Sequence, residues 1–188
     1  MPRPREFDLP AAIGRGTHLL WQKGYEATSL DELLAAMGIG KSSFYAVFRT
    51  KQDFLFKAID HYSDTFLDEL FGDTAQGPAC AVIARTFDSV IDRAGKEGCF
   101  LQNCAIELAH RDTEARAAVR RGIRRLEKAY FQVVARGQES GEIRKDANPV
   151  VLSRYLAASL NGLQTMARVE SDRKALRQVA RIALNTLK

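Results

Sequence analysis

The stretch GYEATSLDELLAAMGIGKSSFYAVFRTK, residues 24–51, decides the fold of this chain. It holds two short helical patterns separated by a glycine turn at residues 38–40. Ser29 and Glu32 have the spacing of a capping box, in which each side chain satisfies a free backbone N–H at a helix start. We therefore expect one helix from Thr28 or Ser29 to Gly38, and a second of about seven residues from Lys41 to Val47.

Two short helices joined by a tight turn form a helix-turn-helix. Apolar residues on both helices and in the turn are expected to face inward and fix the angle between them: Leu30, Leu33, Leu34, Ile39, Phe44 and Phe48. A small polar face is left outside and suits the major groove of DNA. That face consists of Lys41, Ser42, Ser43, Tyr45, Ala46 and Arg49.

Each of these residue types has a use on DNA. Lys41 can donate to a guanine edge or a phosphate, the two serines can donate or accept, and Ala46 can meet a thymine methyl. Phosphate contacts are expected from residues at helix ends, namely Tyr45, Lys51, and Thr28 or Ser29. Any short helix pair with a glycine turn gives a similar pattern, so the pattern alone leaves DNA binding open.

Part of this chain resembles the DNA-binding domain of TetR-family regulators. The resemblance lies in the run Gly24-Tyr25-x-x-Thr28-Ser29-Leu30, in residues 38–48, and in Lys51 and Leu55. The resemblance implies that the helix from Lys41 enters the major groove. It also implies phosphate contacts at Tyr45, Lys51 and Thr28, and core positions at Phe44 and Phe48. The chain departs from the family at Gly40, where a capping Ser or Thr is common, and at Ala46 and Val47, which replace larger polar residues.

The rest of the chain predicts an all-α fold. Apolar residues recur at helical spacing, and alternating strand patterns are absent, so we expect about nine helices. We predict a helix-turn-helix DNA-binding domain over residues 1–50 and a ligand-sensing and dimerisation domain over residues 51–188. A loop at 72–78 and a break at Gly95 and Gly98 interrupt the second part. Further helices are expected at about Leu9–Lys23, from after Thr50 to Phe71, and from the end of the loop to Ala94. Four more are expected at about Cys99–His110, at Thr113–Ser140, beginning at Pro149, and carrying Leu176 to Leu187.

Composition narrows the class of protein. The chain has 188 residues, 46% of them hydrophobic, and a net charge of +5, which suits a polyanionic partner. The excess positive charge is not concentrated in residues 1–51, so the charge distribution alone does not locate a DNA-binding site. We expect no membrane partner and a cytoplasmic location, because no signal peptide or apolar span is evident and the three cysteines have no paired spacing. No catalytic, cofactor or metal motif is present, so we expect neither an enzyme nor a cofactor.

The resemblance implies a homodimer whose last two helices pack against those of the partner. Compatible stripes lie on both helices: Tyr155, Ser159, Gly162, Leu163 and Met166 on the first, and Leu176, Val179, Ala183 and Leu187 on the second. These stripes would also suit the core of one subunit, and periodicity does not separate the two possibilities.

The resemblance also implies a small-molecule inducer, of unknown identity, bound among the middle helices. Cys99, Phe100, Asn103 and Glu107 share one helix face and form the candidate wall of the binding site. Asn103 and Glu107 would equally suit bonds to a neighbouring helix or a loop backbone. Cys99 begins a helix, a position that stabilises thiolates and suits sensing of thiol-reactive compounds, whereas a free cysteine is more often simply buried.

Two basic segments have open roles. Residues 111–128 carry seven Lys or Arg, which indicates a solvated face, an anion-binding surface or a secondary DNA contact. Arg3 and Arg5 lie on an N-terminal arm that would suit a minor groove or remain a tail. Taken together, the sequence predicts a repressor that binds palindromic operator DNA as a homodimer and is released by a small molecule or a thiol-reactive compound. The alternative is a helical protein-interaction adaptor without sequence-specific DNA binding.

Overall fold

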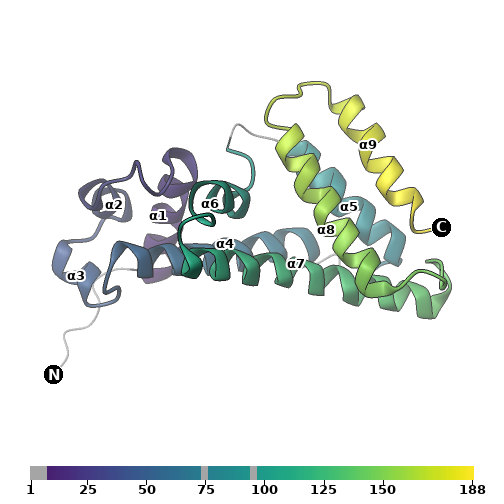
Figure 1. Cartoon of the computed structure of the whole chain (residues 1–188), viewed down its shortest axis with the longest axis horizontal. Helices are drawn as coiled ribbons and strands as arrows, with labels where there is room; N and C mark the ends of the chain where they lie inside the picture. Colours follow the sequence, from purple (N-terminus) through teal and green to yellow (C-terminus); the bar gives the residue numbers. More distant parts are fainter. Residues whose placement is uncertain (1–7, 73–75, 94–96) are drawn as a thin grey trace.

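The computed structural model describes residues 8–72, 76–93 and 97–188, and within these ranges the chain forms helices and no strand, as the sequence predicts. The N-terminal arm with Arg3 and Arg5, the middle of the loop at 72–78, and Gly95 lie outside the described residues. The helices, drawn in Figure 1, are α1 (Leu9–Lys23), α2 (Leu30–Met37), α3 (Lys41–Tyr45), α4 (Lys51–Phe71), α5 (Ala79–Asp92), α6 (Phe100–Leu108), α7 (Thr113–Ser140), α8 (Pro149–Met166) and α9 (Arg173–Asn185).

Local signals set the ends of α2 as predicted. Ser29 caps the helix and forms a capping box with Glu32. Hydrogen bonds from Lys23 and from Ser29 lower the pKa of Glu32 to about 2, which keeps the carboxylate charged at the helix start. Gly38 ends the helix with φ of 70°, a left-handed conformation that glycine adopts without steric cost.

Some helices are shorter than predicted, including α9, which ends at Asn185 before Leu187. The third ends at Tyr45 instead of Val47, because the N–H of Val47 bonds to the carbonyl of Phe44 and tightens the last turn. The sixth runs only from Phe100 to Leu108, with Cys99 as its cap residue. The predicted starts and ends of the long helix α7 are correct.

Helices α4 and α7 run side by side along the long axis and join the two ends of the molecule (Figure 1). One end holds α1, α2, α3 and α6, and the other holds α5, α8 and α9. Buried apolar residues form two clusters that match these ends, and Phe66 of α4 packs against both. The cluster of the first end includes residues of α4, α6 and α7, so the apolar core is continuous across residue 50.

A glycine fixes the close approach of α1 to its neighbours. A Cβ at Gly16 would lie 2.5 Å from Cζ of Phe54 and 2.9 Å from Cγ of Met37. Helices α1, α2 and α4 therefore meet at a point where only glycine fits, which holds the three-helix head firmly on α4. Among the described helices, none is long and apolar enough to cross a membrane.

Candidate DNA-binding surface and ligand cavity

The outer face of α3 is polar and accessible, as predicted. Lys41, Ser42, Ala46 and Arg49 are exposed, Ser43 is partly buried, and the ring of Tyr45 is 49% exposed. On the inner side Phe44 and Phe48 are buried and pack with their rings tilted, the ring centroids 5.0 Å apart. Because the aromatic side is locked into the core, the polar side has a fixed direction. Gly40 caps the helix without a side-chain hydrogen bond.

Thr28 is not part of this surface, contrary to the prediction that it contacts phosphate. Its side chain is 1% exposed, and its hydroxyl donates to the carbonyl of Gly24 at 2.6 Å. The hydroxyl is thus used to close the turn after α1. Ser29 remains exposed, and its hydroxyl is bonded to the carboxylate of Glu32.

Lys51 is only partly exposed and already has partners. Its Nζ donates to the carbonyl of Tyr25 at 2.6 Å and lies 4.2 Å from the centre of the Tyr25 ring. Burial lowers the pKa of Lys51. In this conformation Lys51 joins the start of α4 to the turn after α1, a role that the sequence reading did not include.

Glu107 was expected to face a ligand and instead binds the three-helix head. Its carboxylate accepts hydrogen bonds from the N–H of Tyr25 at 3.1 Å and of Glu26 at 2.7 Å. The prediction that Glu107 lines a ligand site is therefore wrong, and the alternative of a bond to loop backbone is correct. Helix α6 is attached to the head through this contact.

Asn103 also bonds to backbone. Its Nδ2 donates to the carbonyl of Glu97 at 2.9 Å, and its Oδ1 accepts from Arg168 at 3.2 Å. Phe100 is 1% exposed and packs edge to face on Tyr62. The predicted wall of Cys99, Phe100, Asn103 and Glu107 thus does not line the cavity between the two ends of the molecule. These side chains are buried in the core or bonded to the turn after α1 and the segment before α6.

Cys99 is buried as well, at 3% exposure. Burial raises the pKa of its thiol, and this effect exceeds the opposing hydrogen bonds from the backbone of Gln102 and the hydroxyl of Tyr62. Burial likewise raises the pKa of Cys104. In this conformation burial opposes the thiolate that the helix start would stabilise, which favours the alternative of a simply buried cysteine.

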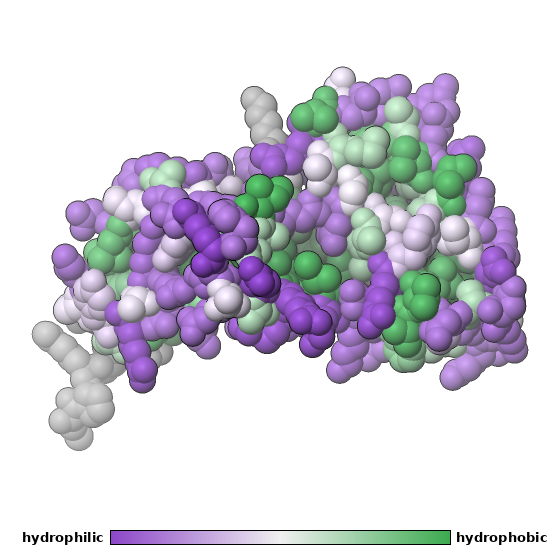
Figure 2. Space-filling view, viewed as in Figure 1, coloured by the Kyte–Doolittle hydropathy of each residue, from purple (hydrophilic) through white to green (hydrophobic). Residues whose placement is uncertain are grey.

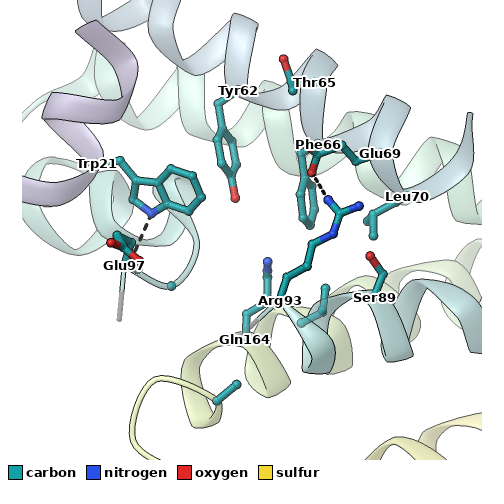
Figure 3. Close-up of a pocket in the computed structure, with 13 residues that line it drawn as sticks. Trp21, Tyr62, Thr65, Phe66, Glu69, Leu70, Ser89, Arg93, Glu97 and Gln164 are labelled. Atoms are coloured by element: carbon teal, nitrogen blue, oxygen red, sulfur yellow. Dashed lines mark hydrogen bonds and ion pairs between the residues drawn. The ribbon is translucent and has the colours of Figure 1, made fainter. Parts of the chain in front are cut away.

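A partly enclosed cavity lies between the two ends of the molecule, with a volume of about 180 Å³ (Figure 3). Its lining comes from α1, α4, α5, the segment before α6, and the end of α8. The residues are Trp21, Tyr62, Thr65, Phe66, Glu69, Leu70, Ser89, Val90, Arg93, Glu97, Gly98, Gln164 and Ala167.

Aromatic rings form one side of the cavity. The rings of Trp21 and Tyr62 meet edge to face at 5.1 Å, and those of Tyr62 and Phe66 stack at 5.6 Å. Glu69 and Arg93 form an ion pair in which both side chains are about half exposed, which places the pair at the mouth. The sequence reading missed this site. The available signal was Tyr62, Phe66 and Leu70, which follow one another at four-residue spacing along one helix face.

The outer faces of α8 and α9 expose apolar side chains. Figure 2 shows hydrophobic surface over these two helices. Their exposed large apolar side chains include Val151, Tyr155, Met166, Val179 and Ile182. Four residues predicted for a dimer interface are instead buried in the core of the subunit itself. These are Leu163, Leu176, Ala183 and Leu187, at 1%, 0%, 4% and 2% exposure.

Some basic residues of the segment 111–128 have local partners. Arg125 pairs with Asp60 at 3.1 Å and Asp64 at 2.9 Å, and Arg111 pairs with Glu26 at 2.9 Å. This favours a solvated face with structural ion pairs over an anion site. In the described part of the chain, no three His, Cys, Asp or Glu side chains gather as metal ligands would.

Comparisons with known proteins agree with this architecture. Residues 13–58 match the family model described as bacterial regulatory proteins, tetR family, and residues 80–183 match that of the tetracyclin repressor-like C-terminal domain. The HTH-type transcriptional repressor ComR of Escherichia coli is 29% identical, over 95% of this chain and 88% of that protein. The HTH-type transcriptional repressor DhaR of a Mycobacterium species is 26% identical, over 93% and 89%.

A solved structure extends the likeness to the whole fold. A cysteine mutant of the TetR family transcriptional regulator CifR, complexed with 26bp double-strand operator DNA, is 26% identical and superposes with a TM-score of 0.80. The match covers 99% of this chain and 100% of that one. The family models together span most of the chain, both in the head and in the body. The chain therefore belongs to the TetR family of bacterial transcriptional regulators.

Proposed function

We propose that this chain is a one-component repressor that binds palindromic operator DNA as a homodimer and is released by a small molecule. The observation that carries DNA binding is the accessible polar face of α3, held in one direction by buried Phe44 and Phe48. An adaptor that binds only protein has no need of this face. No catalysis is proposed, and a regulator of bacterial DNA acts in the cytoplasm.

The proposed DNA contacts divide into two kinds. Lys41, Ser42, Ser43 and Ala46 read base edges in the major groove, and Arg49 and Tyr45 hold phosphates. Ser29, exposed at the start of α2, is a further phosphate contact. Lys51 supports the surface through its hydrogen bond to the carbonyl of Tyr25. It reaches a phosphate only if this hydrogen bond breaks. Thr28 is left out because it is buried.

The proposed dimer uses the exposed faces of α8 and α9. Val151, Tyr155, Gly162 and Met166 follow one another along the outer side of α8, and Val179 with Ile182 continues the surface on α9. Ser159 lies partly buried beside them. A dimer is needed because one short recognition helix reads too few bases, and two heads about 34–36 Å apart match successive major grooves.

We propose that residues 1–50 provide DNA binding and residues 51–188 provide sensing and dimerisation, with α4 connecting them. Tyr62, Phe66 and Glu69 of α4 line the cavity, and the start of the same helix packs under the head. An occupant that moves α4 would change the separation of the two heads. The largest possible effect is set by the difference in ligand affinity between the two states.

A thiol-reactive compound is a second candidate effector, although burial of Cys99 argues against fast reaction in this conformation. A reactive form would need the segment before α6 to open. The small molecule in the cavity is therefore the effector that the geometry favours.

Gel-shift binding to the DNA that flanks the protein's own gene tests the repressor. We expect sequence-specific binding that Tyr45→Ala and Lys41→Ala each weaken. Lys145→Ala is the matched control, because Lys145 is exposed at the far end of the molecule, between α7 and α8. Wild-type affinity in both α3 variants would overturn the proposed DNA surface. Failure of an intact dimer to select any sequence from a random DNA pool would favour the adaptor.

A further inference from the structure

Helix α6 is hydrogen-bonded to α8 through the side chain of Gln102. Its Nε2 donates to the carbonyl of Asn161 at 2.7 Å, and its Oε1 accepts from the hydroxyl of Thr165. The side chain is partly buried, and each polar atom of the amide has a partner on α8. Gln102 therefore joins the first turn of α6 to the last two turns of α8.

A second contact lies one residue further along α6. The Oδ1 of Asn103 accepts from Arg168, just after α8, at 3.2 Å, and its Nδ2 donates to the carbonyl of Glu97 at 2.9 Å. Gly98 permits this approach, because a Cβ there would lie 2.5 Å from Cδ of Arg168. The carbonyl of Glu97 also accepts from the indole N–H of Trp21 in α1 at 3.2 Å. The end of α8 is thus connected to the head.

The last turn of α6 is bound to the head directly. The carboxylate of Glu107 accepts from the backbone N–H groups of Tyr25 and Glu26. Gln102 and Glu107 are five residues apart on one helix, or about 7.5 Å along its axis. The inner face of α6 is buried in the core, so the helix moves as one body and carries a displacement at Gln102 to Glu107.

This connection is separate from the one through α4. Neither Gln102 nor Glu107 lines the cavity to which Tyr62 and Phe66 of α4 contribute. In Figure 1 α6 lies between α1 and the end of α8, whereas α4 runs along the length of the molecule. Because α8 is the helix proposed to meet the partner subunit, a bond from α6 to α8 also relates the head to the dimer.

We propose that Gln102 is a positioning residue for the DNA-binding head. Through α6 and Glu107 it fixes the head relative to α8, and in the dimer it thereby sets the spacing of operator half-sites that the protein accepts. The first part concerns a single subunit. The second part rests on the proposed function, because a half-site spacing exists only for a dimer on DNA.

Trp21 reports the first part, because it is the only tryptophan of the chain and its indole is bonded to the segment before α6. Gln102→Leu removes both bonds to α8 and keeps a side chain of similar size. We expect acrylamide to quench Trp21 fluorescence about twofold more strongly in this variant, with wild-type helix content by circular dichroism. Wild-type quenching in Gln102→Leu would overturn the proposal.

Two further variants support this measurement. Thr165→Val removes one of the bonds from the side of α8, at an exposed position that tolerates the change, and should raise quenching in the same direction. Gln132→Leu, at an exposed site on α7, is the matched control and should leave quenching unchanged. Wild-type quenching in a folded Thr165→Val protein together with a Gln102→Leu protein that does not fold would also overturn the proposal.

Operator spacing tests the second part. Insertion of one base pair between the half-sites shifts one of them by about 3.4 Å and turns it by about 35° around the duplex. We expect Gln102→Leu to lower the preference for the native spacing by about tenfold, while the base preference within each half-site is retained. An equal loss of affinity for both operators is what general destabilisation would give, and it would overturn the proposal.

The double variant Gln102→Leu/Glu107→Gln tests whether α6 carries the effect. Both residues act through the same helix, so the double variant should lose no more of its spacing preference than the more affected single variant. Losses that multiply would show two independent connections and would overturn the role of α6.

The two measurements also separate this proposal from the proposed function. Stronger quenching in Gln102→Leu, in a protein that selects no DNA sequence, would retain the connection through α6 and contradict the repressor. Operator binding with wild-type quenching and wild-type spacing preference in Gln102→Leu would retain the repressor and contradict the positioning role.

Discussion

The carboxylate of Glu107 accepts a hydrogen bond of 2.7 Å from the backbone N–H of Glu26, which joins α6 to the turn between α1 and α2. The same carboxylate also accepts from Tyr25. Gly24 precedes the pair with φ of 92°, and a Cβ there would lie 3.3 Å from the carboxylate. Lys51 holds the carbonyl of Tyr25 from the other side. The turn is thus fixed by α6 and α4 together, and the head cannot move relative to α6 without breaking these bonds.

Glu107→Gln should weaken this attachment. The amide offers one acceptor oxygen where two N–H groups need partners, and it presents an N–H group of its own to the turn. We expect a loss of about 1–3 kcal/mol in the free energy of unfolding, measured by urea denaturation. Operator affinity should fall as well, because the orientation of the head becomes less defined.

Glu139→Gln serves as the control for Glu107→Gln, because Glu139 is exposed on α7 far from the head. Its stability and operator affinity should stay at wild-type values. If Glu107→Gln unfolds at the same urea concentration as the control, the contact contributes nothing and the head is held by packing alone.

Lys41→Ala should change the salt dependence of DNA binding. Each Lys or Arg that neutralises a phosphate adds about one to the slope of log affinity against log salt. If Lys41 contacts phosphate, we expect Lys41→Ala to lower the slope of log affinity against log salt by about one per recognition helix. The protein should then still prefer the same operator sequence. Contact with a guanine edge predicts the opposite pattern, with relaxed specificity at one base pair and a smaller change in slope. Titrations at several salt concentrations on operator and mutated operator distinguish the two roles.

The sequence predicts local structure well where one residue decides it. Ser29 with Glu32 and the left-handed Gly38 mark the ends of α2, and the polar side of α3 follows from buried Phe44 and Phe48. These features depend on neighbours within a few residues, so no knowledge of the tertiary fold is required.

The cavity could not be predicted in the same way. It forms where Trp21, Tyr62 and Gln164 come together from three helices that are distant in sequence. The orientation of α6 also depends on tertiary contacts. For that reason Glu107 forms a hydrogen bond to the turn after α1 instead of facing a ligand. Periodicity identifies a helix face without identifying the partner, so Leu163 on a stripe suited to a dimer is core instead.

The three cysteine thiols should react in the order of their exposure to solvent. Burial raises the pKa of all three thiols, so each holds less thiolate at neutral pH than a free cysteine. Cys80 is only partly buried, whereas Cys99 and Cys104 are buried. With Ellman's reagent we expect one thiol to react in the native protein, and the other two only as fast as the protein opens.

Cys80→Ser should remove the fast phase of this reaction and leave the slow one. A fast phase that persists in Cys80→Ser and disappears in Cys99→Ser would show that the segment before α6 opens readily. That result would restore Cys99 as a sensor of thiol-reactive compounds.

Gly162→Leu should separate the dimer from the fold of the subunit. A Cβ at Gly162 would meet no atom within 4 Å in the subunit, so a larger side chain does not disturb its core. In the proposed dimer the same side chain would push the partner's helices away, since Gly162 lies between Tyr155 and Met166 on the exposed face of α8. We expect a folded monomer at micromolar concentration in analytical ultracentrifugation, with wild-type helix content and much weaker operator binding. Ala117→Leu, at an exposed position on α7, should remain a dimer. If the Gly162→Leu protein is still a dimer, the interface does not lie at this position of α8. A different interface would then have to set the spacing of the two heads.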